Sequence, residues 1–273
     1  MGRVIFIGAG PGSADLMTVR GANRLAQADV VLFDALTDPA LRELAPRARW
    51  INVGKRGYTG VQGSPGFPAC DSTGQTAINA LLVKHAREVD VVVRLKGGDP
   101  SVFGRLEEEL EALAHAGIEC EVVPGVTAAT AAAAATQRPL TRRGAGRSVS
   151  LTTAMTSEGR LQASRCADTE VFYMAGKQLA ALSRRLRAAG WDEDTPASVV
   201  SRAGWPDPLH SDHSVRNLGR AAMLHAGRPT VVTVGVGAAP LAAAGVAVVA
   251  QAQTQTQAPV SLRAGGSVEA RGA

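Results

Sequence analysis

The sequence is poor in aromatic residues and has no long apolar run. Only 4% of its 273 residues are Phe, Trp or Tyr. Proteins that bind single-stranded nucleic acid stack bases on aromatic side chains, so this scarcity disfavours an RNA-binding module although the net charge is +5. No apolar run approaches the roughly 18 residues of a membrane-spanning helix, and MGRVIFIGAG enters a strand without a signal-peptide pattern. We therefore expect a cytoplasmic protein that binds neither membranes nor nucleic acids. A polyanionic small substrate explains the positive charge as well as a nucleic acid would.

Cysteine is also scarce. Cys70, Cys120 and Cys166 lie far apart and form no CxxC pair, which excludes both a disulfide framework and a zinc cluster of the usual spacing. We expect reduced thiols, two of them buried. His210 and His213 have the spacing of half a metal site, but no cysteine is near, and GWPDPLHSDHS is typical of a surface loop. No metal site is expected.

The third glycine of a dinucleotide-binding fingerprint is missing. GAGPGS begins at Gly8 and has Ser13 where GxGxxG needs glycine, while Pro11 lacks the amide that a pyrophosphate would use. This argues against a nicotinamide or flavin oxidoreductase. A turn shaped around a ligand without phosphates and a purely structural turn both remain open.

Strands and helices alternate along the first half of the chain. This order is typical of an α/β layer with a largely parallel sheet, which places ligands at the carboxyl ends of its strands. After the strand of VIFIGAGPGS, strands are predicted at 29–36, 50–56, 89–95 and 118–124, and helices at 16–28, 75–87, 106–116 and 126–136.

A polar link, RPLTRRG, separates this half from a second α/β unit. There we expect strands at 148–154, 170–176, 197–203 and 229–237 and a helix at 177–189. The predicted domains are therefore 1–137 and 148–237, joined by a linker at 138–147. The segment 57–74 has too many glycines and prolines for regular structure and is predicted to be a long loop, and 238–273 is predicted to be a disordered tail.

The most informative segment is RLKGGDPSVFGR, at 94–105. The β-branched run VDVVVRL ends there in Gly97, Gly98, Asp99 and Pro100. Glycines let the backbone approach a bound molecule closely, and a carboxylate accepts hydrogen bonds from hydroxyls. An ordinary strand-to-helix turn favours the same residues, so both interpretations stay open at this point.

Other polar residues stand where strands end. Asp34 follows a predicted strand and is a candidate acid, base or hydrogen-bond acceptor, or a helix cap. Two cationic pairs, Lys55 with Arg56 and Arg142 with Arg143, lie next to a strand end and in the domain link. Anion contacts and solvated surface charge explain these pairs equally well.

Four separated segments together resemble the uroporphyrinogen-III C-methyltransferases within the tetrapyrrole methylase family. They are GAGPGSADLMT near the start, VGKR at 53–56, RLKGGDPSVFGR at 94–105 and VVPGVTAA at 122–129, and PLTRRG, FYMAGK and RPTVVTVG extend the likeness through the second unit. The resemblance implies two α/β domains with the cofactor S-adenosylmethionine in the cleft between them, a tetrapyrrole substrate, no metal, and a homodimer. It also implies methylation of uroporphyrinogen III at C2 and C7 to give precorrin-2. The alternative is another precorrin C-methyltransferase of the same family.

The family motifs also imply roles for individual residues. Asp34, Lys55, Arg105 and Glu108 match positions linked to catalysis, and Arg56, Arg142 and Arg143 would bind substrate carboxylates. The expected cofactor contacts are Pro11, Gly97, Gly98, Asp99, Val102, Thr127, Ala128, Met174, Ala203 and Thr230.

The chain departs from the family pattern in several places. Arg142 stands where relatives often carry His, the segment 153–155 replaces TGH, and the segment 201–203 replaces ENG. The loop 57–74 is longer than usual. These changes concern the rim of the cofactor site and the substrate mouth, and they leave the Gly-Gly-Asp core intact.

Overall fold

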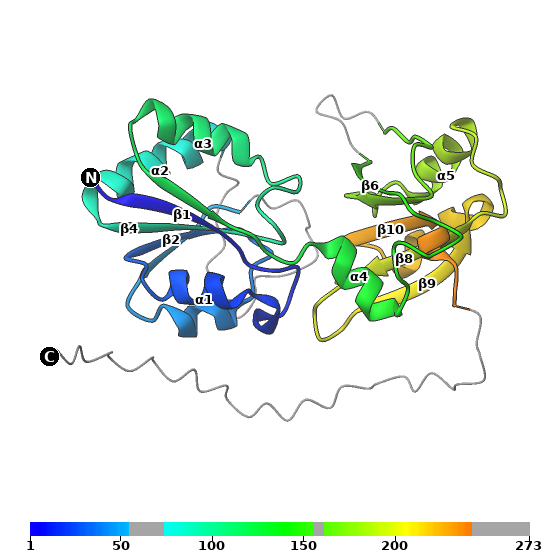
Figure 1. Cartoon of the computed structure of the whole chain (residues 1–273), viewed down its shortest axis with the longest axis horizontal. Coiled ribbons are helices and arrows are strands. Elements are labelled where there is room, and N and C mark those ends of the chain that lie inside the picture. Colours follow the sequence, from blue (N-terminus) through cyan, green and yellow to red (C-terminus); the bar gives the residue numbers. More distant parts are fainter. Residues whose placement is uncertain (55–73, 155–160, 242–273) are drawn as a thin grey trace, which may run out of the picture. The chain divides into compact units, whose positions relative to one another are not determined.

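The first half of the chain forms a parallel sheet of five strands in the order β3-β2-β4-β1-β5 (Figure 1). A computed structural model of the chain describes residues 1–54, 74–154 and 161–241. The three central strands are buried on both faces. The apolar runs of β1 and β2 predict this burial, whereas β4 is buried although it contains Arg94 and Lys96. The strands are β1 (Arg3–Gly8), β2 (Val30–Phe33), β3 (Arg49–Asn52), β4 (Val91–Lys96) and β5 (Cys120–Val123).

Helices cover both faces of this sheet (Figure 1). On one face α2 (Gln75–Glu88) and α3 (Leu106–His115) pack against alternate strand residues such as Phe6. On the other face α1 (Val19–Leu25) and the 3-10 helix η2 (Pro39–Leu44) pack against the intervening residues, such as Ile7. A further 3-10 turn, η1 (Ala14–Leu16), precedes α1. Neighbouring strand residues therefore belong to two separate cores, as a sheet buried on both faces requires.

The second half contains a mixed sheet in the order β6-β7-β10-β8-β9. Only the β6 and β7 pair is parallel, and the other pairs are antiparallel. Apolar side chains of α5 and η3 fill one face, and α4 lies against the other. The elements are α4 (Ala128–Thr136), β6 (Val149–Thr153), β7 (Thr169–Tyr173), α5 (Leu179–Ala188), β8 (Pro196–Ser201), β9 (Leu209–Ser214), η3 (Val215–Arg220), α6 (Ala221–Leu224), β10 (Thr230–Gly235) and η4 (Val236–Ala238).

Both sheets direct a set of loops to one edge. Because β1, β4 and β5 are parallel, the loops that follow them meet at the carboxyl edge of the first sheet. In the second sheet β10 runs antiparallel to β7 and β8, so its start lies beside their ends. Residues Met1–Leu241 form one compact unit, in which loops from the two edges come into contact, as described below.

Two sequence expectations were wrong. The segment around His210 and His213, predicted to be a surface loop, contains the edge strand β9. Its residues are polar on both faces because each face meets polar partners, so no apolar alternation marked the strand. Two of the three cysteines were expected to be buried. Cys120 and Cys166 are both exposed, so at most one cysteine can be buried.

Other expectations fall only partly on described residues. In the part of the chain that the structure describes, no helix is long and apolar enough to cross a membrane. Residues 57–73 of the predicted loop and 242–273 of the predicted tail lie outside that part. The gap between the end of α4 and the start of β6 contains the predicted linker, and the domain boundaries stay predictions.

Candidate functional site

Four glycines pack backbone to backbone where β1, β4 and β5 end. Gly10 and Gly98 form an antiparallel bridge, with N···O distances of 3.2 and 2.7 Å. A Cβ atom on Gly125 would lie 2.3 Å from the Gly98 carbonyl oxygen, and one on Gly8 would lie 2.5 Å from the Gly125 Cα atom. No side chain fits at Gly8 or Gly125, which explains the glycines at these two positions.

The Gly97–Gly98 turn is open on its other side. A Cβ atom on Gly97 would meet only the Leu36 Cβ atom, at 3.8 Å, and one on Gly98 would meet nothing closer than 4.0 Å. Gly97 is exposed, and Gly98 has a φ of +72°, which favours glycine. The turn therefore presents bare backbone to a space that a bound molecule could fill.

Asp99 fastens this turn to the next loop. One carboxylate oxygen, Oδ2, accepts a hydrogen bond from the Gly125 amide at 2.9 Å, and Oδ1 accepts one from the Ser101 amide at 2.8 Å. The Asp99 carbonyl accepts a bond from the Val102 amide at 3.2 Å. Each carboxylate oxygen keeps a second lone pair, so Asp99 anchors the loop and can still accept a bond from a ligand.

A buried charge network lies beneath the turn. Glu109 of α3, with no exposed surface, accepts bonds from Arg94 Nε at 2.9 Å and from Lys96 Nζ at 2.5 Å. Burial opposes the charge on Arg94, but the carboxylates of Asp34 and Glu109 outweigh it and raise the pKa of Arg94. Burial and the neighbouring Arg94 lower the pKa of Lys96. Two cations and two carboxylates thus compensate one another inside the first domain.

This network holds Asp34. Its Oδ1 atom accepts a 2.6 Å bond from Arg94, and its Oδ2 atom lies 3.4 Å from the Gly97 amide. The side chain is one-third exposed, at 32%. Asp34 therefore joins the end of β2 to the Gly97 turn, and Asp38, four residues later, is the residue that caps the following 3-10 helix.

The second sheet adds residues to this edge through direct contacts. The hydroxyl of Thr127 lies 2.7 Å from the phenol of Tyr173, next to the half-exposed Met174. The Ser13 amide donates to the Gly204 carbonyl at 2.8 Å, and a Cβ atom on Gly204 would lie 2.8 Å from the Pro11 ring. We use the name loop cluster for residues 8–13, 97–105, 124–128, 173–176, 201–205 and 228–230.

The loop cluster contains all ten predicted cofactor residues. Ala128 begins α4 directly after Thr127. Ala203 and Thr230 are both 5% exposed, and the Thr230 hydroxyl donates to the Arg228 carbonyl at 2.8 Å. The structure therefore brings together residues that are up to 219 positions apart, from Pro11 to Thr230.

Backbone strain concentrates in the loop cluster. Of the five non-glycine residues with positive φ in the described ranges, four belong to it, and the fifth, Gln137, ends α4. Such conformations cost about 1–3 kcal/mol each and collect at functional sites. The four residues are Phe103, Arg105, Met174 and Arg202.

Arg105 and Glu108 form a bidentate pair at the start of α3. The Nε···Oε1 distance is 2.7 Å and the Nη2···Oε2 distance is 2.6 Å, and both side chains are nearly half exposed. The bond to Glu108 raises the pKa of Arg105, which therefore stays protonated. Lys55 and Arg56, the other predicted cations of this edge, lie outside the described residues.

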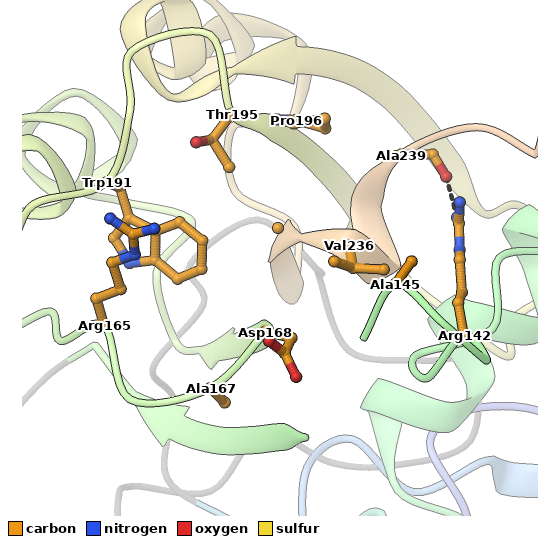
Figure 2. Close-up of a pocket in the computed structure, with 11 residues that line it drawn as sticks. Arg142, Ala145, Arg165, Ala167, Asp168, Trp191, Thr195, Pro196, Val236 and Ala239 are labelled. Atoms are coloured by element: carbon orange, nitrogen blue, oxygen red, sulfur yellow. Dashed lines mark hydrogen bonds between the residues drawn. The ribbon is translucent and has the colours of Figure 1, made fainter. Parts of the chain in front are cut away.

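Arg142 and Arg143 are not brought together with the other predicted residues. Arg142 lines a cavity of about 480 Å³ with Asp168, Trp191 and Gly235, and its guanidinium donates to the Ala239 carbonyl (Figure 2). Asp168 precedes β7 and Gly235 ends β10, so the cavity lies at the opposite edge of the second sheet from Met174 and Thr230. Arg143 follows in the same exposed turn.

Some residues of the site were not predicted. Tyr173, Phe103 and Gly204 take part through contacts between segments distant in sequence, and the sequence gives no spacing signal for such contacts. Gly125 stands in the VVPGVTAA motif, but its packing role needed the structure. Within the described ranges, no group of three His, Cys, Asp or Glu residues could hold a metal ion.

Comparisons with known proteins agree with this arrangement. Residues 3–219 match the family model "Tetrapyrrole (Corrin/Porphyrin) Methylases". Over 206 residues the chain is 43% identical to a uroporphyrinogen-III C-methyltransferase of Pseudomonas aeruginosa, covering 74% of this chain and 80% of that protein. It is 42% identical to a siroheme synthase of Hahella chejuensis over 217 residues, 76% of this chain but only 43% of the synthase.

A solved structure is also similar. The uroporphyrin-III C-methyl transferase of Thermus thermophilus, complexed with S-adenyl homocysteine, superposes with a TM-score of 0.71 at 32% identity, and the match covers 86% of this chain and 97% of that chain. The family match includes every segment of the loop cluster except 228–230. The chain belongs to the tetrapyrrole (corrin/porphyrin) methylase family.

Proposed function

We propose that the chain transfers methyl groups from S-adenosylmethionine to carbons C2 and C7 of uroporphyrinogen III, giving precorrin-2 and two molecules of S-adenosylhomocysteine. The similarity to uroporphyrinogen-III C-methyltransferases over most of the chain supports this reaction. The match covers 43% of the length of the siroheme synthase. The homodimer implied by the family resemblance stays a prediction.

The open face of the Gly97–Gly98 turn is the observation that carries the methyl-donor assignment. Bare backbone lets a ligand come within contact distance, and the remaining lone pairs of Asp99 can accept bonds from ribose hydroxyls. Pro11 offers no amide to a phosphate, which suits a nucleoside without phosphates. The half-exposed thioether of Met174 is an uncharged neighbour for a sulfonium.

The chain's contribution to the reaction is alignment. S-adenosylmethionine, when bound, supplies an electrophilic methyl group, and the tetrapyrrole carbon is already an electron-rich nucleophile. Holding two reactants in line can contribute about 7–11 kcal/mol to lowering a barrier. The hydrogen bonds of Asp99 and the close backbone packing around Gly125 fasten the Gly97–Gly98 turn to the neighbouring loop, which supports this role.

Partners already engage the carboxylates of this edge. A carboxylate paired tightly with the sulfonium would stabilise the reactant more than the transition state and slow the transfer. Glu109 is paired with Arg94 and Lys96, and Asp99 accepts two backbone amides. This arrangement fits a site that binds S-adenosylmethionine without forming a tight ion pair with its sulfonium.

Substrate contacts are assigned to the same edge. Uroporphyrinogen III has eight carboxylates, and Arg105, which stays protonated, can bind one of them by a charge-assisted hydrogen bond of about 1.5–3 kcal/mol. Leu36 and Phe103 are exposed apolar neighbours for the macrocycle. Asp34, oriented by Arg94, is the residue we assign to accept the ring proton that leaves after methylation.

The test is an anaerobic incubation with uroporphyrinogen III and isotopically labelled S-adenosylmethionine, followed by counting methyl groups per product by mass spectrometry. Two added methyl groups support the proposal. No transfer to uroporphyrinogen III would overturn it. Transfer only to a later precorrin, offered in a parallel incubation, would identify the chain as another precorrin C-methyltransferase of the family.

A further inference from the structure

The Tyr173 phenol joins three segments of the loop cluster. Its oxygen lies 2.7 Å from the Thr127 hydroxyl and accepts a bond from the Ala129 amide at 3.3 Å. Its ring lies against Phe103, with centroids 5.1 Å apart and planes inclined at 58°. Tyr173 ends β7 of the second sheet, whereas Phe103 belongs to the turn that follows β4 of the first sheet.

Tyr173 also replaces a missing helix cap. Thr127 is the N-cap residue of α4, yet its side chain makes no capping bond to its own helix. The Ala129 amide, one of the first amides of α4, finds its acceptor in the Tyr173 oxygen instead. The start of α4 is thus held by a side chain from β7.

The phenol remains a hydrogen-bond donor at neutral pH. Burial raises the pKa of Tyr173 despite the opposing bonds from Thr127 and the Ala129 amide. A protonated phenol can accept from Ala129 and exchange a hydrogen bond with Thr127 at the same time. The contact is therefore kept across the pH range in which the enzyme would work.

Two of these segments contain residues predicted to contact the methyl donor S-adenosylmethionine. Thr127 and Ala128 precede Ala129 directly, and Met174, with a φ of 58°, follows Tyr173. A shift of the Tyr173 side chain would let the start of α4 and the Met174 backbone move independently. We infer that Tyr173 is a positioning residue that sets the spacing between two sides of the methyl-donor site, the start of α4 at Thr127 and Ala128 and the backbone at Met174. This inference rests on the proposed function.

The test is Tyr173→Phe, which keeps the ring against Phe103 and removes only the hydroxyl. Calorimetry should show that S-adenosylhomocysteine binds roughly fivefold more weakly, the usual effect of losing one neutral hydrogen bond. The KM for S-adenosylmethionine should rise by a similar factor, while kcat at saturating donor stays within about twofold, because Tyr173 is assigned no contact with the reacting atoms. Wild-type affinity in Tyr173→Phe would overturn the inference.

A double-mutant cycle tests the route through Thr127. In a Thr127→Val background, Tyr173→Phe should weaken binding by less than it does in the wild-type chain, because only the bond from the Ala129 amide remains to be lost. Full additivity would overturn the inference, because the phenol would then act without Thr127.

Ser183→Ala is the matched control, because the Ser183 hydroxyl donates a buried 2.6 Å bond to the Val215 carbonyl on the face of the second sheet that α5 covers. It should lower the melting temperature and leave donor affinity unchanged. An equal loss of affinity in Ser183→Ala would show that lost stability explains the effect, and this too would overturn the inference. A wild-type chain that does not bind S-adenosylhomocysteine would instead remove the proposed function.

Discussion

The substitution Gly97→Ala tests whether the Gly97–Gly98 turn binds a ligand or has only a structural role. Gly97 lies outside the left-handed region, so alanine can adopt its backbone conformation. The nearest atom to the new methyl group would be the Leu36 Cβ atom at 3.8 Å, an ordinary van der Waals distance. Among the described residues, no atom lies close enough to oppose this substitution.

The structure predicts opposite effects of Gly97→Ala on stability and on binding. Replacing glycine where alanine fits restricts the unfolded chain and stabilises a protein by about 0.4–1 kcal/mol. If the donor occupies the open face, the same methyl group overpacks the site, at about 1–3 kcal/mol. This cost corresponds to roughly 5- to 150-fold weaker binding.

The assay pairs chemical denaturation with calorimetric titration of S-adenosylhomocysteine. Gly125→Ala is the comparison, since its methyl group would lie 2.3 Å from the Gly98 carbonyl oxygen and should reduce both stability and binding. Gly97→Ala should reduce binding alone. Wild-type affinity in a stable Gly97→Ala protein would refute the assignment of the open face to the methyl donor.

Four further substitutions test the site and the structure around it. Glu109→Gln leaves two buried cations undercompensated and should lower the free energy of unfolding by about 3–5 kcal/mol, whereas Glu108→Gln, in a half-exposed pair, should lower it by less than about 1 kcal/mol in denaturant titrations. Burial lowers the pKa of His225 from 6.5 to about 4. As pH falls, the His225 imidazole therefore takes up a proton in the unfolded chain before it does so in the folded chain. The free energy of unfolding should drop by up to about 2 kcal/mol between pH 8 and 5, and His225→Gln should flatten that part of the pH profile. Asp99→Asn removes the negative charge that accepts hydrogen bonds from the Ser101 and Gly125 amides. The affinity for S-adenosylhomocysteine, measured by calorimetry, should fall roughly tenfold. Unchanged affinity would limit Asp99 to a structural role.

The sequence was most informative where local chemistry decides structure. The run VIFI in β1 and the run VVV at the start of β4 are apolar without alternation, which indicates burial on both faces, and the order of strands and helices indicates a parallel sheet. The motif around Gly97 and Asp99 marked the correct strand end. Each of these strands, helices and turns could be predicted because the residues that determine it are neighbours in the sequence.

Contacts between distant residues could not be predicted in the same way. The network that orients Asp34 joins it to Arg94, 60 positions later, and Arg94 to Glu109 on another element. Hydrophobic periodicity contains no information on which buried charges pair. The contact of Tyr173 with Thr127 depends on how the ends of two sheets meet, which is a tertiary property.

The density of charge in the sequence does not indicate at which edge of a sheet a cationic pair lies. Arg142 and Arg143 form one of the densest cationic pairs, yet their turn lies at the edge of the second sheet remote from Met174. A charge pair in a linker has no strand register to fix its direction. The polar strand β9 was missed for a related reason, because its faces are both polar and only its pairing with β8 reveals it.

The most direct test of the account is a titration of the chain, labelled with ¹³C at its methionine methyl groups, with S-adenosylhomocysteine. The resonance of Met174, assigned through Met174→Leu, should shift on binding, whereas that of Met223, which is 91% exposed on α6, should not. This result would place the methyl donor at the loop cluster. Binding that shifts Met223 and leaves Met174 unchanged would contradict the central claim.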